Sequence, residues 1–165
     1  HVEDVLGLTA KTSGRHLHLP GNLSAAREFG WIRFQIRERE AQVFRYEIEV
    51  PGELQLKEIA KIVKVARLVD GADAGFAVAL VPGRRLVVRT RQPGDRYRIS
   101  PGSAEKSLKK LLIERKIPRK NRDRLVVCEC DGKVVWVEGL PPGSGFNSGV
   151  SYENAFTIEV QNETF

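Results

Sequence analysis

The chain has 165 residues, 41% of them hydrophobic and 29% charged, which suits one ordinary folded domain with a small additional part. No run of about 18 apolar residues occurs, so no membrane-spanning helix is predicted. Cys128 and Cys130 are too close in sequence for a good disulfide, and the composition excludes a disulfide scaffold. No secretion leader opens the chain, and these features together favour the cytoplasm. Because the sequence contains no Met, we expect a piece of a longer protein.

The first part of the chain predicts a helix followed by a β-hairpin. Residues 1–8 place apolar side chains at helical spacing, which indicates the end of a helix. Apolar and polar residues alternate in 16–19 and again in 31–36, which predicts two strands joined by a turn and a short irregular piece. We assign these elements to a region 1–40 and a second domain to residues 41–165.

The second domain predicts mostly strands. Clean alternation in 43–50 indicates one strand. Residues 54–69 fit either a helix or a strand, and the β-branched residues Ile62, Val63 and Val65 favour the strand. Further predicted strands are 76–81, 86–91, 125–130, 133–138 and 155–160, with a two-residue Asp-Gly hairpin turn after the third of them. The sequence therefore predicts an α+β fold with a mostly antiparallel sheet and one or two short helices.

One amphipathic helix is predicted at residues 103–116, with Ser103 as its cap and Glu105 in its first turn. Its buried stripe comprises Ala104, Leu108, Leu111 and Leu112. Lysines occupy the opposite side, where Glu114 is expected to offset the charge of Lys110. Pro118 then begins a further short turn. The helix should thus pack by its leucines and present ammonium groups to solvent.

The positive charge is concentrated in residues 84–124. This segment holds 15 Lys or Arg and four Asp or Glu, a net charge of +11, which leaves −5 for the rest of the chain. A basic segment is often only a solvated face, but a field this concentrated favours a polyanion, and a phosphate backbone first among polyanions.

The lysine row suits contacts with an RNA backbone better than the reading of bases, because no Asn or Gln lies among the lysines. We also expect Arg89 and Arg91 to alternate on a strand and to extend the row. The predicted RNA-binding residues are Arg89, Arg91, Arg96, Lys106, Lys109, Lys110, Lys116, Arg119, Lys120, Arg122 and Arg124. The alternative function is a protein-interaction module without RNA contact, whose basic face docks on an acidic surface of its own catalytic domain.

Four motifs lie between residues 86 and 140. The run Arg89–Arg96 has the pattern Arg-x-Arg-x-x-Gly-Asp-Arg, and Lys106–Leu112, Lys116–Arg119 and Val135–Gly139 follow it. Together these motifs resemble the C-terminal domain of the tRNA(Ile)-lysidine synthetases. This resemblance implies a fold like an accessory domain of phenylalanyl-tRNA synthetase, in contact with the body of a tRNA. Residues 1–40 are similar to the end of the substrate-binding region ahead of that domain.

Enzymes of this family use ATP to activate the wobble cytidine of an isoleucine tRNA, and the amino group of free lysine then displaces AMP to form lysidine. The resemblance therefore implies tRNA(Ile) with an unmodified wobble cytidine, lysine and ATP as partners. ATP with magnesium belongs to an N-terminal domain with a Ser-Gly-Gly-x-Asp-Ser loop, which these 165 residues do not contain. We expect no catalytic residue, metal or cofactor in this part of the enzyme, and no activity from it alone.

Other reactive side chains receive structural interpretations. Cys128 and Cys130 lie on one strand face, so core packing is favoured over metal binding. His16 and His18 share a strand face and are interpreted as partly exposed, and not as metal or RNA ligands. Asp95 is expected to form a structural ion pair with a neighbouring arginine, Arg91 or Arg96, and not to act as a catalytic acid.

Two further patterns could indicate contacts with a nucleotide. Trp136 could stack on a base, but it lies in an apolar strand, so we predict that it is a core residue. The glycine-rich stretch 143–149 resembles a dinucleotide-binding loop with one residue too many. It precedes a strand instead of opening a helix, so we interpret it as an ordinary loop.

Overall fold

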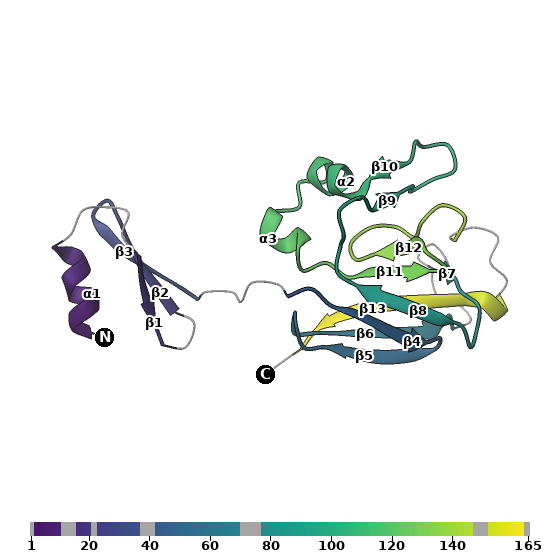
Figure 1. Ribbon diagram of the computed structural model, residues 1–165, viewed down its shortest axis with the longest axis horizontal. Helices are drawn as coiled ribbons and strands as arrows, with labels where there is room; N and C mark the ends of the chain where they lie inside the picture. The colour runs from purple at the N-terminus through teal and green to yellow at the C-terminus, as the bar shows by residue number, and fades with distance from the viewer. Residues whose placement is uncertain are drawn as a thin grey trace. The chain divides into compact units, whose positions relative to one another are not determined.

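The structure is a computed structural model that describes residues 2–10, 16–20, 23–36, 42–69, 77–146 and 152–163 (Figure 1). The chain divides into two compact units, His1–Glu40 and Ala41–Phe165, called here the N-terminal and C-terminal units. Within the described ranges, no helix has the length and apolar character needed to cross a membrane.

The N-terminal unit contains helix α1 (Val2–Thr9) and three antiparallel strands, β1 (His16–Leu19), β2 (Leu23–Glu28) and β3 (Trp31–Ile36), in the order β1-β2-β3. The helix and the two outer strands were predicted. The irregular piece expected between the strands is instead β2, because it pairs with both neighbours and buries two alanines, Ala25 and Ala26. The turn expected between the two predicted strands begins at Pro20, and its other two residues, 21 and 22, lie outside the described ranges.

The first sheet of the C-terminal unit is antiparallel, with the order β12-β11-β8-β4. Its strands are β4 (Arg45–Glu49), β8 (Arg85–Arg89), β11 (Val127–Cys130) and β12 (Lys133–Val137). Asp131 and Gly132 join β11 to β12 with φ angles of 50° and 78°, as a type I′ turn requires. The predicted Asp-Gly hairpin is therefore confirmed.

The second sheet is also antiparallel, with the order β5-β6-β13-β7. Its strands are β5 (Gly52–Leu56), β6 (Lys61–Arg67), β7 (Val78–Ala79) and β13 (Ala155–Asn162). The strand favoured for residues 54–69 is confirmed for its β-branched part, which lies in β6, whereas residues 54–56 belong to β5 and residues 57–60 form the turn between the two strands. Strands β7 and β8 lie close in sequence but belong to different sheets, because β7 pairs with β13 whereas β8 pairs with β4 and β11.

The two sheets bury a common apolar core between them. Phe156 and Val63 from the second sheet and Val88 from the first are fully buried in it. Each side chain of this size contributes roughly 1.5–3 kcal/mol when it is fully buried. Cys128 and Trp136 belong to the same core, which confirms the structural interpretation of both residues. The fold is thus α+β with mostly antiparallel sheets, as predicted.

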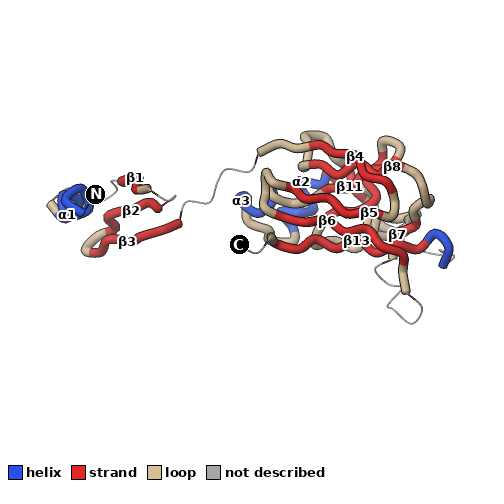
Figure 2. The backbone as a smooth tube through the Cα atoms, turned by 90° about the horizontal axis from the view of Figure 1, so that it is seen from below, coloured by secondary structure: helices blue, strands red, loops and turns tan. Residues whose placement is uncertain are grey.

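A third layer covers the other face of the first sheet. It comprises β9 (Arg96–Tyr97), β10 (Lys106–Ser107), α2 (Leu108–Glu114) and α3 (Arg119–Arg122). A short 3-10 helix, Tyr152–Asn154, precedes β13. Figures 1 and 2 show α2 and α3 on the side of this sheet that faces away from β5, β6 and β13. Val127 packs under this layer while its neighbour Cys128 faces the main core, because successive strand residues point to opposite faces.

Candidate nucleic-acid interface

Helix α2 is held on the sheet by its leucines. Leu108 and Leu112 are fully buried and Leu111 nearly so, which confirms these three positions of the predicted stripe. The helix begins at Leu108, and the Oγ of Ser107 accepts a hydrogen bond from the backbone N–H of Lys110 at 3.2 Å. Ser107 is therefore the N-cap that orients the first turn of α2.

The predicted start of this helix at Ser103 is wrong, because β10 pairs with β9 and keeps the backbone extended until the N-cap. Ser103 lies in a turn, where its Oγ donates to the carbonyl of Ser100 at 2.9 Å. Ala104 is exposed and is not part of the leucine stripe. Glu105 lies outside the helix and forms an ion pair with Arg96 at 3.0 Å.

The lysines of this segment differ in their surroundings. Lys109 and Lys110 are exposed on the side of α2 away from the leucines. Lys106 lies in β10 and forms an ion pair with Glu114 at 2.8 Å. The principal partner of Glu114 is therefore Lys106, and not Lys110 as expected. The hydrogen bond from Lys106 lowers the pKa of Glu114, and the charge of Lys110 adds to that effect.

Helix α2 ends in a Schellman motif with Lys116 at the position that glycine usually occupies. The N–H of Ile117 donates to the carbonyl of Leu112 at 3.1 Å, and the N–H of Lys116 donates to that of Ile113 at 2.9 Å. Lys116 has a φ of 58°, in the left-handed region. The motif reverses the chain and leaves the Lys116 side chain exposed at the end of α2.

The turn after α2 forms helix α3, for which Pro118 is the N-cap residue. Arg119 and Lys120 are exposed, and Arg122 is half-buried. Within the described ranges, five of the predicted residues have no ion pair with an acid: Lys109, Lys110, Lys116, Arg119 and Arg122. The two helices and the turn between them therefore present several cations that form no ion pair with a carboxylate of the described residues.

Arg89 does not lie on this surface, so the prediction that it extends the exposed row is wrong. Its side chain is 3% exposed and donates to both carboxylate oxygens of Asp95, at 2.8 and 2.9 Å. Its Nε donates to Glu129 at 2.8 Å. Burial by itself would lower the pKa of Arg89, but the hydrogen bonds to Asp95 and Glu129 outweigh it and raise that pKa. This guanidinium is a structural cation.

Three other predicted residues make intramolecular contacts. Arg91 follows the end of β8 and pairs with Asp123 at 3.0 Å, so it does not share a strand face with Arg89. Arg96 uses its guanidinium on Glu105, as described above. Arg124 donates to the backbone carbonyl of Ile59 at 2.9 Å, which ties the segment after α3 to the turn between β5 and β6. These contacts reduce the availability of the three arginines for another ligand.

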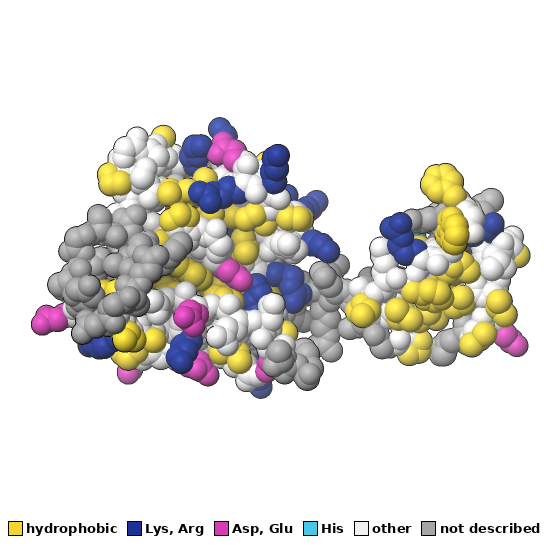
Figure 3. All heavy atoms as spheres, turned by 180° about the vertical axis from the view of Figure 1, so that it is seen from behind, with side chains coloured by type: hydrophobic (Ala, Val, Ile, Leu, Met, Phe, Trp, Pro, Cys, Tyr) yellow, Lys and Arg dark blue, Asp and Glu magenta, His cyan; other side chains and the backbone are white. Residues whose placement is uncertain are grey.

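A cleft of about 620 Å³ lies beside the two helices. Its basic lining residues are Arg91, Lys109, Arg119 and Arg122, and Asp95, Ser107 and Asp123 line it as well. The Nε of Arg91 and the Nε of Arg122 are buried without an acceptor in the described part of the chain. Figure 3 shows Lys and Arg side chains gathered on the part of the C-terminal unit that carries α2 and α3, with few acids between them.

The remaining interpretations have mixed outcomes. His16 and His18 share the exposed face of β1, as expected. Asp95 forms the structural ion pair that was predicted, but its partner is Arg89 and not Arg91 or Arg96. The glycine-rich stretch is described only up to residue 146. Ser107 was not predicted as the cap of α2, although a serine directly before a leucine-rich run is a recognisable N-cap signal.

The C-terminal unit is thus a domain of two antiparallel sheets with a basic helical layer. Residues 86–154 match the family model of the TilS substrate C-terminal domain. A crystal structure of a TilS C-terminal domain aligns with a TM-score of 0.54 and 28% identity, covering 74% of this chain and all of that one. Residues 86–154 belong to this domain family, and the C-terminal unit has its fold.

The chain is also related to tRNA(Ile)-lysidine synthases over almost all of its length. It is 27% identical to that of Caldanaerobacter subterraneus and 23% identical to that of Clostridium acetobutylicum, with 99% of this chain covered in each case. The bifunctional protein TilS/HprT of Listeria monocytogenes is 34% identical over 75% of the chain. The chain spans only 37% and 38% of the first two relatives and 20% of the third.

Proposed function

We propose that this chain is the tRNA-contacting part of a cytoplasmic tRNA(Ile)-lysidine synthase, and that α2 and α3 contact the phosphate backbone. The observation that carries the proposal is the group of exposed cations on these helices that have no acidic partner among the described residues. The relatives named as tRNA(Ile)-lysidine synthases support a tRNA as the polyanion.

The chemistry of the cleft agrees with a phosphate ligand. Arginine presents a planar fork of donors that matches phosphate oxygens, and lysine supplies a point charge. Arg119 and Lys109 line the cleft without an ion pair, and Arg91 and Arg122 each keep a buried Nε–H without an acceptor in the described residues. A buried donor without an acceptor costs about 1–3 kcal/mol. An anionic oxygen in the cleft would supply acceptors that the described part of the chain lacks.

The whole enzyme is proposed to be a ligase that joins free lysine to the wobble cytidine of tRNA(Ile) with ATP and magnesium. The 165 residues contain no Ser-Gly-Gly-x-Asp-Ser loop, and the described residues hold no group of three or more His, Cys, Asp or Glu suited to a metal. We propose that ATP and magnesium bind to another domain of the enzyme. The role proposed for this chain is to hold the tRNA while another domain performs the reaction.

Binding of unmodified tRNA(Ile) to the 165-residue chain tests the RNA contact. Replacement of Lys109 and Lys110 by alanine should weaken binding, because two unpaired cations leave the surface. The matched control replaces Lys57 and Lys64, two exposed lysines outside the basic segment, and should bind like the unmodified chain. Equal binding by both double variants would contradict the proposed surface. It would favour the alternative in which the basic face docks on an acidic surface of the catalytic domain.

The chain by itself should neither hydrolyse ATP nor form lysidine. The test incubates it with ATP, magnesium, lysine and unmodified tRNA(Ile), and measures AMP release and nucleoside composition. Addition of a full-length tRNA(Ile)-lysidine synthase to the same mixture is the positive control. Turnover by the chain above a blank without protein would overturn the division of labour proposed here.

A further inference from the structure

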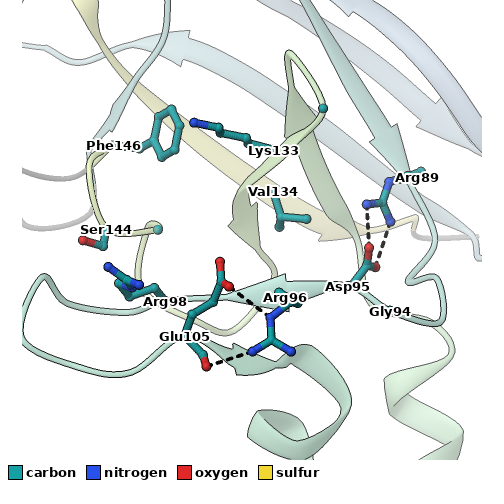
Figure 4. Close-up of a pocket in the computed structure, with 12 residues that line it drawn as sticks. Arg89, Gly94, Asp95, Arg96, Arg98, Glu105, Lys133, Val134, Ser144 and Phe146 are labelled. Atoms are coloured by element: carbon teal, nitrogen blue, oxygen red, sulfur yellow. Dashed lines mark hydrogen bonds and ion pairs between the residues drawn. The ribbon is translucent and has the colours of Figure 1, made fainter.

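A second cleft of about 530 Å³ lies beside β9 and the β11–β12 hairpin. Its lining includes Arg96, Arg98, Glu105, Lys133, Ser144 and Phe146 (Figure 4). The volume falls within the range of roughly 300–1,000 Å³ that is typical of small-molecule sites. Of this group only Arg96 was predicted to bind RNA, and the exposed lysines of α2, Lys109 and Lys110, do not line this cleft.

The charged residues of this cleft fall into two groups. Arg96 pairs with Glu105 at 3.0 Å, so its charge is offset within the wall of the cleft. Arg98 and Lys133 are exposed, and neither has an ion pair in the part of the chain that the structure describes. In Figure 4, Lys133 extends toward the ring of Phe146, and Arg98 lies beside Ser144. Two unpaired cations thus flank one aromatic ring and one hydroxyl group.

The loop that carries Ser144 and Phe146 is fixed by backbone hydrogen bonds. The N–H of Ser144 donates to the carbonyl of Arg98 at 2.8 Å, and the carbonyl of Phe146 accepts from the N–H of Ala79 at 2.7 Å. A Cβ atom on Gly143 would lie 3.3 Å from the Tyr97 ring, so glycine permits the close approach of this loop to β9. The backbone positions from which the aromatic ring and the hydroxyl group project are therefore fixed by the fold.

We propose that this cleft binds one unpaired nucleotide of the bound RNA, with its base against Phe146 and its phosphate between Arg98 and Lys133. The ligand chemistry is a nucleoside monophosphate unit, because a π-face, a hydroxyl group and two unpaired cations complement a base, a sugar and a phosphate. An aromatic ring stacks on a base only when that base is free of its own helix. The inference rests on the proposed function, since it assumes that the chain binds RNA.

An RNA strand fits this site better than a free nucleotide because the two clefts adjoin. Gly94 and Asp95 line both of them, so one turn separates the cleft beside α2 and α3 from the cleft beside β9. A polyanion held by Lys109 and Arg119 can continue across this turn to Arg98. A mononucleotide would use only one of the two clefts.

The test compares two RNAs that differ only in an unpaired end. One is a blunt hairpin, and the other carries a 3′ extension of about four unpaired nucleotides, a length that falls in the range of single-strand sites. The 165-residue chain should bind the extended hairpin roughly tenfold more tightly, as one stacked base allows. Phe146→Leu keeps an apolar side chain in the partly buried position and should abolish this preference, whereas Phe146→Tyr should retain it. Replacement of both Arg98 and Lys133 by alanine should also abolish it.

The controls separate this inference from the proposed function. Replacement of Lys57 and Lys64 should leave the preference unchanged. If neither hairpin binds, the proposed function fails. If both bind with equal affinity, RNA binding holds but the nucleotide site is refuted. If AMP at micromolar concentration lowers the affinity for the extended hairpin to that for the blunt hairpin, the site takes a free nucleotide. The assignment to an RNA strand is then overturned.

Discussion

Arg89 donates two hydrogen bonds to Asp95, and this bidentate ion pair attaches the Gln92–Asp95 turn to the end of strand β8. The turn has the form expected of Pro-Gly at its centre, with Gly94 at a φ of 87° and the N–H of Asp95 donating to the carbonyl of Gln92. The carbonyl of Asp95 accepts from the N–H of Leu108, the first residue of α2. The same aspartate therefore positions the turn between the two clefts and the start of the basic helix.

Replacement of Asp95 by asparagine should lower the free energy of unfolding by about 3 kcal/mol, because it leaves a buried guanidinium without one of its charged partners. Urea unfolding measures the change. Asp131→Asn is the matched control, since its ion pair with Arg84 is exposed and should contribute about 1 kcal/mol or less. Equal effects of the two substitutions would show that the buried ion pair contributes no more to the free energy of unfolding than the exposed one.

Leu111→Ala should destabilise the C-terminal unit by about 2–5 kcal/mol, because it removes a buried side chain from the cluster under α2. A thermal melt should show a lower midpoint. Ile113→Ala tests an exposed position of the same helix and should change stability by about 0.5 kcal/mol or less. If the Leu111 variant melts at the same temperature as the unmodified chain, this face of α2 has been assigned to the core incorrectly.

Lys116→Gly should stabilise the fold and weaken RNA binding at the same time. A side chain in the left-handed region costs roughly 1–2 kcal/mol, and the greater freedom of glycine in the unfolded chain removes part of the gain, so we expect a net increase of about 1 kcal/mol. Affinity for tRNA should fall because one exposed cation is lost. Lys116→Ala keeps the backbone strain but loses the charge, and should weaken binding without stabilising the fold. If both variants bind tRNA with unchanged affinity, Lys116 does not contact the RNA.

The affinity for tRNA should fall steeply with salt concentration, because each phosphate contact releases a counterion. The slope of log affinity against log salt should be about −0.7 to −0.9 per phosphate neutralised. The Lys109 and Lys110 double variant should flatten this slope by roughly one to two units, with a nearly unchanged melting temperature. Its loss of affinity should be similar for cognate and unrelated tRNAs, because phosphate contacts carry no sequence information. An unaltered slope would exclude α2 as the contact surface.

Local sequence patterns determined the elements whose geometry depends on a few neighbouring residues. The Asp131-Gly132 turn follows from the positive φ angles that a two-residue hairpin needs, and alternation predicted most strands of both sheets. The leucine spacing likewise identified the buried face of α2, because helical periodicity places positions 108, 111 and 112 together. The concentration of charge in residues 84–124 needed only counting.

Tertiary structure alone decided what depends on residues far apart in the chain. Ser103 and Ser107 are both plausible caps, and the pairing of β10 with β9 decides between them by keeping the intervening backbone extended. An arginine is ordinarily exposed to solvent, but Arg89 is buried. Its ion pairs with Asp95 and Glu129 offset the free-energy cost of burying its charge. Local periodicity cannot predict the contact of Arg89 with Glu129, which lies 40 residues further along the chain, because only folding brings β8 and β11 together.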